Sequence, residues 1–490
     1  MSEDELRVTR GEAGTKDAIG LRSGALGTFS MTMQSISFVG PAFSALLLFQ
    51  VIAGFSGVSV GFAYLIAGAI IVMVALSLGT LAARLPSAGG YVTYLTRALG
   101  AQSGFLINWL FIAYIAIAPG FIVGYAGYVC EQALKAQYGF DLPWWTVLIA
   151  VMALVTAVVF FGIRPSARTM IALGIAEGGL VLALAIWGLA KPGPGGFSLA
   201  PLSPGSAPSF HGLYLGVIFS LLAFAGWEGA VPLAEEARRP ARSVPVALVA
   251  AVLCIVALFV VANWGLMVGW GTRELPSLLG SQQAPPLVLA HRYWGGSWVL
   301  VLVALLNSVV CASIASFNAV TRMWYSVARS GLGPPKMARV HPRYRTPTYA
   351  IAAQSLLALG VGLGFGLWLG PVNSFLTLSL LTTLALVVIY VAGNIAVIAF
   401  FARSDARVHP LLHVVFPVLT SAVIIYVGYE SLNPLPPSPV RWGAVACGVW
   451  LVLGVTAVAA SGRDRLRRWA SDTRLVLEDR MTPAGSEDAA

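Results

Sequence analysis

Two glutamates lie inside apolar stretches that are long enough to cross a membrane. Glu228 lies near the middle of residues 213–234, and Glu177 lies near the middle of residues 169–190. A carboxylate inside a bilayer costs several kcal/mol by most scales, so acids in spans are rare and mark substrate or ion pathways. The first hypothesis from the sequence is therefore transport across a membrane.

Helix-breaking residues lie in the first apolar stretch, residues 30–52. Gly40 and Pro41 occur near its middle. Because proline lacks a backbone donor and clashes with the preceding turn, they predict a break just before Pro41. Taken alone, these residues are better explained by a kinked but continuous helix.

A second break is predicted at Gly226–Gly229, around Glu228, with Pro232 close behind. If the first ten spans form two repeats of five, the two breaks fall in spans one and six, which are equivalent positions. Paired interruptions of this kind are the best sequence indication of a transporter binding site. A broken helix bares amides at one end and carbonyls at the other, and an α-amino acid carries a group suited to each.

The composition and the charge-free gaps predict an all-α membrane protein with twelve spans. Hydrophobic residues make up 58% of the 490 residues, charged residues make up 10%, and the mean hydropathy is +0.82. We expect a cytoplasmic tail over residues 1–22, a twelve-helix transporter domain over 23–462, and a second cytoplasmic tail over 463–490.

The basic residues predict the orientation. With twelve spans, 25 of the 30 Lys and Arg residues fall on one side, which the positive-inside rule makes cytoplasmic. Both termini are then cytoplasmic, and the net charge of +10 reflects topology in a lipid bilayer, with no nucleic-acid partner expected. The predominance of Arg over Lys favours a bacterial inner membrane, which is a plasma membrane.

Three stretches resemble a known family of transporters. They are RLPSAGGYVTYLTRALGAQSGFLINW (84–109), LLAFAGWEGAVPLAEEARRPARSVPVAL (221–248) and TRMWYSVARSGLGPPKMARVHPRYRTP (321–347). In this order and at these spacings, the chain is similar to amino acid permeases of the amino acid–polyamine–organocation (APC) superfamily. The resemblance implies a 5+5 inverted repeat with broken first and sixth helices, two further C-terminal helices, and transport by alternating access.

The resemblance also implies where the substrate binds. Relatives carry Gly-Ser-Gly five to seven positions before the proline of span one, where this chain keeps only the serine. The implied substrate site consists of Gln34, Ser35, Ile36, Ser37, Phe224, Ala225, Gly226 and Trp227.

Glu177 is the acid expected to take part in ion coupling. Some relatives have a lysine at this position, in place of a bound sodium ion. Burial favours the protonated form of a carboxyl group, so Glu177 could titrate during transport. The alternatives are a structural acid bonded to freed carbonyls or to Ser313 or Ser316 of span eight, and a sodium ligand.

Glu228 is expected to support the broken helix or to act in gating, with substrate contact as the alternative. Tyr114, Tyr390 and Asn394 could reach the central cavity, although such residues more often form a hydrogen bond between helices than a contact to a ligand.

These features predict a secondary active transporter of amino acids, neutral ones favoured. The alternative is a transporter or exchanger of the same fold for a cationic amino acid, a polyamine or another amine. Neither a channel nor an enzyme is expected, because the sequence contains no repeated pore motif and no catalytic cluster. No cofactor or metal is expected; protons are the expected coupling ion, and sodium is the alternative.

Overall fold

The computed structural model describes residues 27–85, 90–162, 167–329, 332–344, 346–404, 407–467 and 469–470. The expected tail over residues 1–22 and most of the tail over 463–490 lie outside the described residues.

Every element of the described part of the chain is helical. The longer helices are α2 (Thr28–Val39), α3 (Leu48–Ser56), α4 (Val60–Arg84), α5 (Gly90–Leu99), α6 (Ala101–Phe111), α7 (Ala118–Tyr138), α8 (Trp144–Phe160), α9 (Ala167–Ala190), α10 (Phe210–Ala223), α11 (Pro240–Trp270), α13 (Pro285–Trp294), α14 (Val299–Arg329), α15 (Thr348–Leu369), α16 (Pro371–Arg403), α17 (Phe416–Leu432) and α18 (Arg441–Ala460). Short elements include the five-residue helix α12 (Leu275–Leu279) and the π-helical segments η2 (Phe43–Leu47), η4 (Ile112–Ala116) and η10 (Leu411–Val415).

The chain is a multi-pass membrane protein. Ten helical segments of the described residues are long and apolar enough to cross a bilayer. One of them, Thr28–Arg84, is 57 residues long and contains α2, α3 and α4, whereas a single span needs about 20 residues. The apolar helix Trp144–Phe160 is slightly shorter than the other spans. Outward-facing Leu356, Leu367 and Trp368 on α15 are 70–74% exposed, as expected of side chains that face lipid.

The first predicted break is present at Gly40. Helix α2 ends at Val39, and Gly40 adopts a left-handed conformation with φ of 66°. Pro41 follows, and the chain continues through the π-helical segment η2 into α3. The local reason is the one that the sequence suggests: glycine tolerates positive φ, and proline cannot continue the hydrogen bonding of the preceding turn.

The second predicted break is also present and begins two residues earlier than expected. Helix α10 ends at Ala223, a turn occupies residues 224–226, and Gly226 has φ of 98°. The chain resumes as the 3-10 helix η7 (Trp227–Glu236) rather than as an α-helix. Both interruptions therefore contain a glycine in a conformation that other residues rarely adopt.

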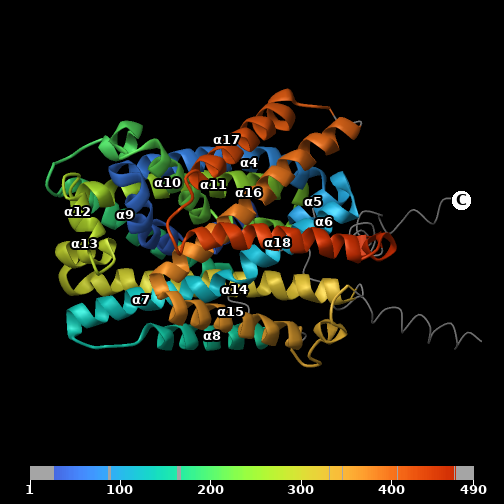
Figure 1. Cartoon of the computed structure of the whole chain (residues 1–490), viewed down its shortest axis with the longest axis horizontal. Coiled ribbons are helices and arrows are strands. Elements are labelled where there is room, and N and C mark those ends of the chain that lie inside the picture. The colour runs from blue at the N-terminus through green and yellow to red at the C-terminus, as the bar shows by residue number, and fades with distance from the viewer. Residues whose placement is uncertain are drawn as a thin grey trace, which may run out of the picture.

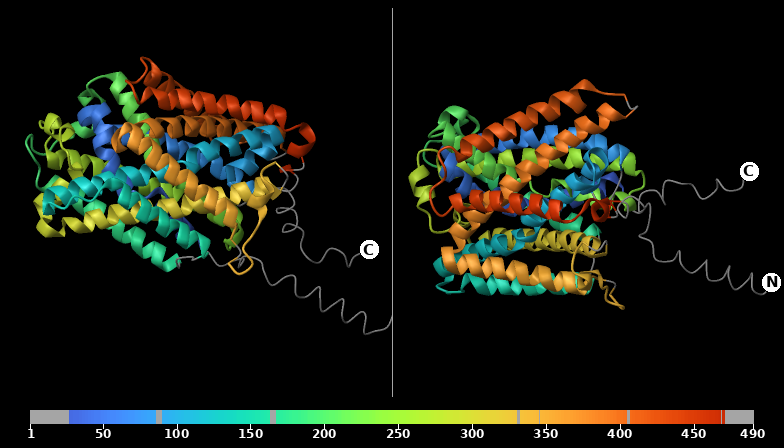
Figure 2. Two further views of the ribbon diagram at one scale, coloured as in Figure 1. Left: turned by 60° about the horizontal axis from the view of Figure 1, so that its bottom comes forward. Right: turned by 45° about the vertical axis from the view of Figure 1, so that its right-hand side comes forward.

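The helices form two packed groups. Helices α7, α8, α14 and α15 pack against one another and lie side by side in the lower part of Figure 1. Helices α2, α3, α4, α10 and α11 form the second group, and α9 packs against both α11 and α2. Helices α16, α17 and α18 pack along the side of these groups, as the two views in Figure 2 show.

Candidate functional site

The two breaks contact each other directly. The Oγ atom of Ser35 in α2 accepts a hydrogen bond of 2.8 Å from the backbone N–H of Ala230 in η7. Phe38 lies over both glycines of the second break: an added Cβ on Gly229 would be 2.8 Å from Phe38 Cδ1, and one on Gly226 would be 3.1 Å from the Phe38 carbonyl oxygen. The absence of side chains at these glycines therefore permits the close approach of α2 and η7.

The residues of the first break differ in one respect from the prediction. Gln34–Ser37, which the family resemblance places at the substrate, lie within α2, so their backbone is helical and its amides are not bared. The interruption lies at Gly40, three to six residues later. Ser35 and Ser37 are buried, whereas Gln34 and Ile36 remain partly exposed. Relatives carry Gly-Ser-Gly at these positions, where this chain has Gln34, Ser35 and Ile36. Glutamine and isoleucine have lower backbone freedom than glycine, so the helix continues through them.

Protein side chains already hold the amide end of the first break. The backbone N–H of Ala42 donates to Glu177 Oε1 at 2.7 Å, and that of Phe43 donates to Ser308 Oγ at 3.1 Å. These amides begin the second half of the broken helix, where the helix dipole favours an anion. Glu177 thus bonds to freed amides, and not to the freed carbonyls considered from the sequence.

The partners of Glu177 on the eighth predicted span are Asn307 and Ser308. Asn307 Nδ2 donates to Glu177 Oε2 at 3.1 Å, so each carboxylate oxygen accepts a hydrogen bond. Ser313 and Ser316, the partners expected from the sequence, lie roughly 9 and 14 Å further along α14 and do not supply this contact. Glu177 is buried, with 4% of its surface exposed, and it joins α9, α14 and the first break.

Glu228 lies among three buried tyrosines from three different elements. Tyr91 of α5, Tyr114 of η4 and Tyr390 of α16 are all close enough to interact electrostatically with its carboxylate. The backbone amides of Gly226 and of Glu228 itself also contact the carboxylate, in line with the expected support of the broken helix. We call these four side chains the Glu228–tyrosine cluster.

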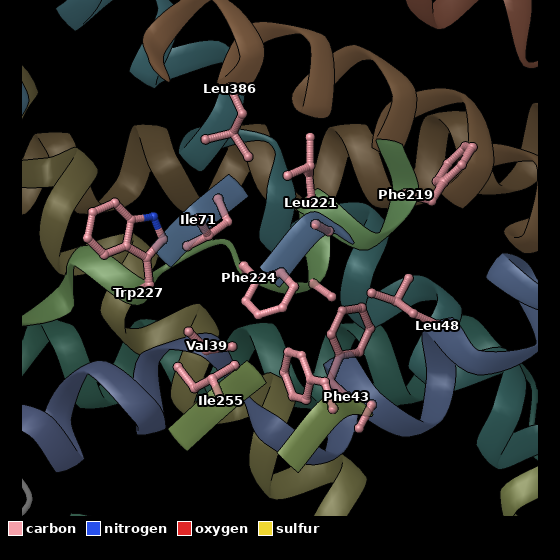
Figure 3. Packing of buried hydrophobic residues seen from close by; sticks show 14 of the residues in the cluster. Val39, Phe43, Leu48, Ile71, Phe219, Leu221, Phe224, Trp227, Ile255 and Leu386 are labelled. Atoms are coloured by element: carbon pink, nitrogen blue, oxygen red, sulfur yellow. The ribbon is translucent and has the colours of Figure 1, made fainter. Parts of the chain in front are cut away.

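The other residues expected in span six divide between packing and polar contacts. Phe224 is fully buried and packs against Phe259 of α11, with ring centroids 5.3 Å apart. Trp227 is also buried, and its Nε1 atom donates to Tyr390 Oη at 3.2 Å. Figure 3 shows both residues among the buried side chains of α2, α4 and α11. Ala225 lies in the turn between them and is partly exposed.

The structure also places Tyr114 and Asn394, two of the residues expected to reach the central cavity. Tyr114 lies in the π-helical segment η4, a local widening that is frequent at functional sites, and its hydroxyl lies against the backbone of Gly226. Gln354 of α15 donates to Ala116 O at 2.8 Å and thereby holds this segment. Asn394 instead donates through Nδ2 to Thr420 and Ser421 of α17, so its amide joins two helices.

Comparison with known proteins decides the family. A sequence profile of the amino acid permease family matches residues 30–468. The chain belongs to the amino acid permease family, within the APC superfamily.

Several bacterial transporters resemble this permease along most of its length. An uncharacterised transporter of Mycobacterium tuberculosis is 29% identical over 317 residues, which cover 64% of this chain and 67% of the relative. The branched-chain amino acid permease BcaP of Bacillus subtilis is 24% identical over 373 residues, covering 71% of this chain and 75% of the relative. The low-affinity putrescine importer PlaP of Escherichia coli is 24% identical over 317 residues, covering 64% and 68%.

Sequence reasoning missed three residues of this permease site: Tyr91, Asn307 and Ser308. Asn307 carried a usable signal, because an amide inside an apolar span is uncommon and usually has a polar partner. Tyr91 lies outside the predicted spans, and only the folded chain brings its ring to the break in span six. For Ser308, the sequence contains no signal that separates it from the other serines of α14.

Proposed function

We propose that this permease is a secondary active transporter that moves amino acids across the plasma membrane by alternating access. The observation that carries the proposal is the direct contact between the two interrupted helices, made by Ser35 and Ala230 and by Phe38 and Gly226. Discontinuous helices at the midplane form the substrate site of many secondary transporters. The contact between the breaks is therefore the part of the fold where a transported solute is expected to bind.

The proposed topology has twelve crossings. Two repeats of five spans would each begin with an interrupted helix, α2–α3 in the first and α10–η7 in the second, and α17 and α18 would follow. Both termini would be cytoplasmic, in a bacterial inner membrane. The uneven distribution of basic residues supports this orientation.

Proton coupling through Glu177 is the proposed energy source. Glu177 links the first break to α14 through Ala42 and Asn307, so a change in its charge would alter both contacts. Protonation would give the carboxyl group a donor and weaken it as an acceptor for the Ala42 and Asn307 N–H groups. A purely structural role for the acid and sodium coupling are the competing hypotheses.

Neutral amino acids are the proposed substrates. The similarity to the branched-chain amino acid permease BcaP supports this class. The similarity to the putrescine importer PlaP supports the alternative, a transporter of the same fold for cationic amino acids, polyamines or other amines.

Uptake into proteoliposomes tests the proposed function. The purified permease is reconstituted, and uptake of neutral amino acids, cationic amino acids, polyamines and nucleobases is measured under an imposed proton gradient, a sodium gradient or neither. We expect saturable uptake of at least one amino acid, stimulated by the proton gradient. Absence of uptake for every amino acid would overturn the proposal, and non-saturating flux would indicate a channel.

A further inference from the structure

Two polar atoms of the Glu228–tyrosine cluster are buried without a hydrogen-bond partner. Glu228 Oε2 and Tyr91 Oη have almost no exposed surface, and neither bonds to any residue that the structure describes. Tyr91 as a whole is 5% exposed. Since buried polar atoms are nearly always paired, two unpaired ones beside a single site indicate that another group binds there.

The chemistry of the cluster specifies that group. An ionised carboxylate oxygen only accepts hydrogen bonds, and a phenol oxygen can also accept. Tyr390 Oη already accepts from Trp227 Nε1 at 3.2 Å. A binding partner with several N–H donors would pair these oxygens, and its positive charge would be balanced by an ionised Glu228. A primary ammonium group meets both needs.

Aromatic rings around the cluster also suit a cation. The Tyr91 ring lies 5.8 Å from the Phe111 ring and 6.4 Å from the Tyr390 ring, measured between centroids. Ring faces attract cations within about 6 Å of the centroid. The cluster therefore combines a buried carboxylate oxygen with aromatic rings from three elements.

The first break, in contrast, has little to offer a substrate carboxylate. Its leading amides, those of Ala42 and Phe43, donate to Glu177 and Ser308. A substrate carboxylate would have to displace a protein carboxylate that is already in place. The positive end of this half-helix is thus satisfied from within the protein.

We propose that the permease recognises its substrate through an ammonium group bound between Glu228 and Tyr91, and that a substrate carboxylate is dispensable. This inference rests on the proposed function, because it takes the contact between the breaks to be the transport site. The substrate class is then primary amines, of which neutral amino acids are one part. Decarboxylated amines are the other part.

Matched sets of three ligands test the inference. Leucine, 3-methylbutylamine and 4-methylpentanoate share a side chain but carry both charged groups, only the ammonium, or only the carboxylate. Alanine, ethylamine and propionate form a second set, and phenylalanine, 2-phenylethylamine and 3-phenylpropanoate form a third. Binding is measured by thermal stabilisation of the detergent-solubilised full-length protein, since a ligand that binds the native state raises the melting temperature.

We expect the amine and the amino acid of at least one set to stabilise the protein, and the acid of that set to have no effect. Stabilisation by the acid but not by the amine would overturn the inference, as would an absence of stabilisation in all three sets. If amines bind but no solute is taken up by proteoliposomes, the proposed function fails while the ammonium site stands.

Two variants locate the site. Glu228→Gln keeps the volume but removes the charge, and we expect the Kd for the amine to rise tenfold or more. Tyr91→Phe removes one acceptor, and we expect a several-fold rise; it serves as the main test if Glu228→Gln does not fold. Glu274→Gln, an exposed acid between α11 and α12, is the matched control. Wild-type amine affinity in the folded cluster variants would place the ammonium elsewhere.

Discussion

Glu177 occupies an unusual electrostatic position for a membrane-buried acid. Its two oxygens accept hydrogen bonds from a free helix amide and from Asn307, while only 4% of its surface is exposed. The amide end of a helix and two donors favour the ionised form, whereas burial favours the neutral form. A change in the surroundings of Glu177 that shifted this balance would change its protonation.

Replacing Glu177 by glutamine tests coupling at this residue. The amide oxygen of the new side chain can still accept from Ala42, and Asn307 can turn its amide to keep the second bond, so the fold should persist. We expect Glu177→Gln to keep the exchange of substrate across the membrane of preloaded vesicles. We expect it to lose the stimulation of uptake by an imposed proton gradient. The measurement is proteoliposome uptake with and without that gradient, with Glu274→Gln as control. A proton-stimulated Glu177→Gln variant would rule out this acid as the coupling site.

Ser35 is expected to be a stabilising contact between the breaks. Its Oγ atom is the acceptor for Ala230 N–H, and the residue is fully buried. Ser35→Ala would leave a buried amide unpaired, at a cost of about 1–3 kcal/mol. We expect a clear fall in melting temperature in detergent. Ser56→Ala is the matched control, because the Ser56 hydroxyl donates to the Ile52 carbonyl within its own helix; equal melting of the two variants would contradict the role of Ser35.

At the scale of elements, the sequence predicted the interruptions but not their partners. The breaks depend on the local backbone geometry of Gly40, Pro41 and Gly226, and the residue types at these positions indicate that geometry directly. The bonds of Glu177 to Asn307 and Ala42 join residues 130 and 135 positions apart, so no local pattern encodes them. The helical backbone of Gln34–Ser37 has a related cause, since this chain lacks the two glycines that relatives carry there.

The close contact of α2 with η7 depends on the second-break glycines. A Cβ at position 229 would lie 2.8 Å from Phe38 Cδ1. We therefore expect Gly229→Ala to lower both thermal stability and transport. Adding Phe38→Ala to Gly229→Ala should restore stability relative to Gly229→Ala alone, because it removes the clashing ring. Gly179→Ala is the control, since an added Cβ there meets no atom within 4 Å; an unrescued double variant would show that the strain lies elsewhere.

Helix α18 is joined to α6 by a reciprocal pair of tryptophans. Trp109 Nε1 donates to Trp450 O at 3.0 Å, and Trp450 Nε1 donates to Trp109 O at 3.1 Å. Their rings stack with centroids 4.7 Å apart. This contact fixes α18 to α6, which continues into the segment η4 that contains Tyr114. Helix α18 should therefore move with α6 and η4.

A double-mutant cycle measures this connection. Trp109→Phe and Trp450→Phe each remove one indole donor, and we expect each to lower the free energy of unfolding in mixed micelles by about 1 kcal/mol. The coupling energy for two residues in contact should lie at about 0.5–3 kcal/mol. Trp368→Phe, at a residue that is 74% exposed, should change stability by less than about 0.5 kcal/mol. Strict additivity at Trp109 and Trp450 would mean that the pair adds no mutual stabilisation.

At the scale of the whole molecule, the exposed apolar side chains and the distribution of basic residues both indicate how the helices lie in the membrane. Apolar side chains cover the outer surface of α15, whereas 25 of the 30 basic residues fall on one proposed side of the membrane. The hydrophobic effect sets the depth of the helices, and the basic loops set their direction. Neither determines the substrate, whose choice we propose to lie with a few polar atoms around the two breaks.

The orientation predicts which loops a membrane-impermeant reagent can reach. In a variant with the four native cysteines replaced, single cysteines are introduced as Arg273→Cys, Lys336→Cys, Arg441→Cys or Arg463→Cys, all at exposed positions. With twelve crossings, 273 and 441 lie outside and 336 and 463 lie inside, so a maleimide added to intact cells should label only the first pair. All four should react in permeabilised cells. Because α18 alone separates 441 from 463, labelling of both in intact cells would remove the last crossing and place the C-terminus on the outer side.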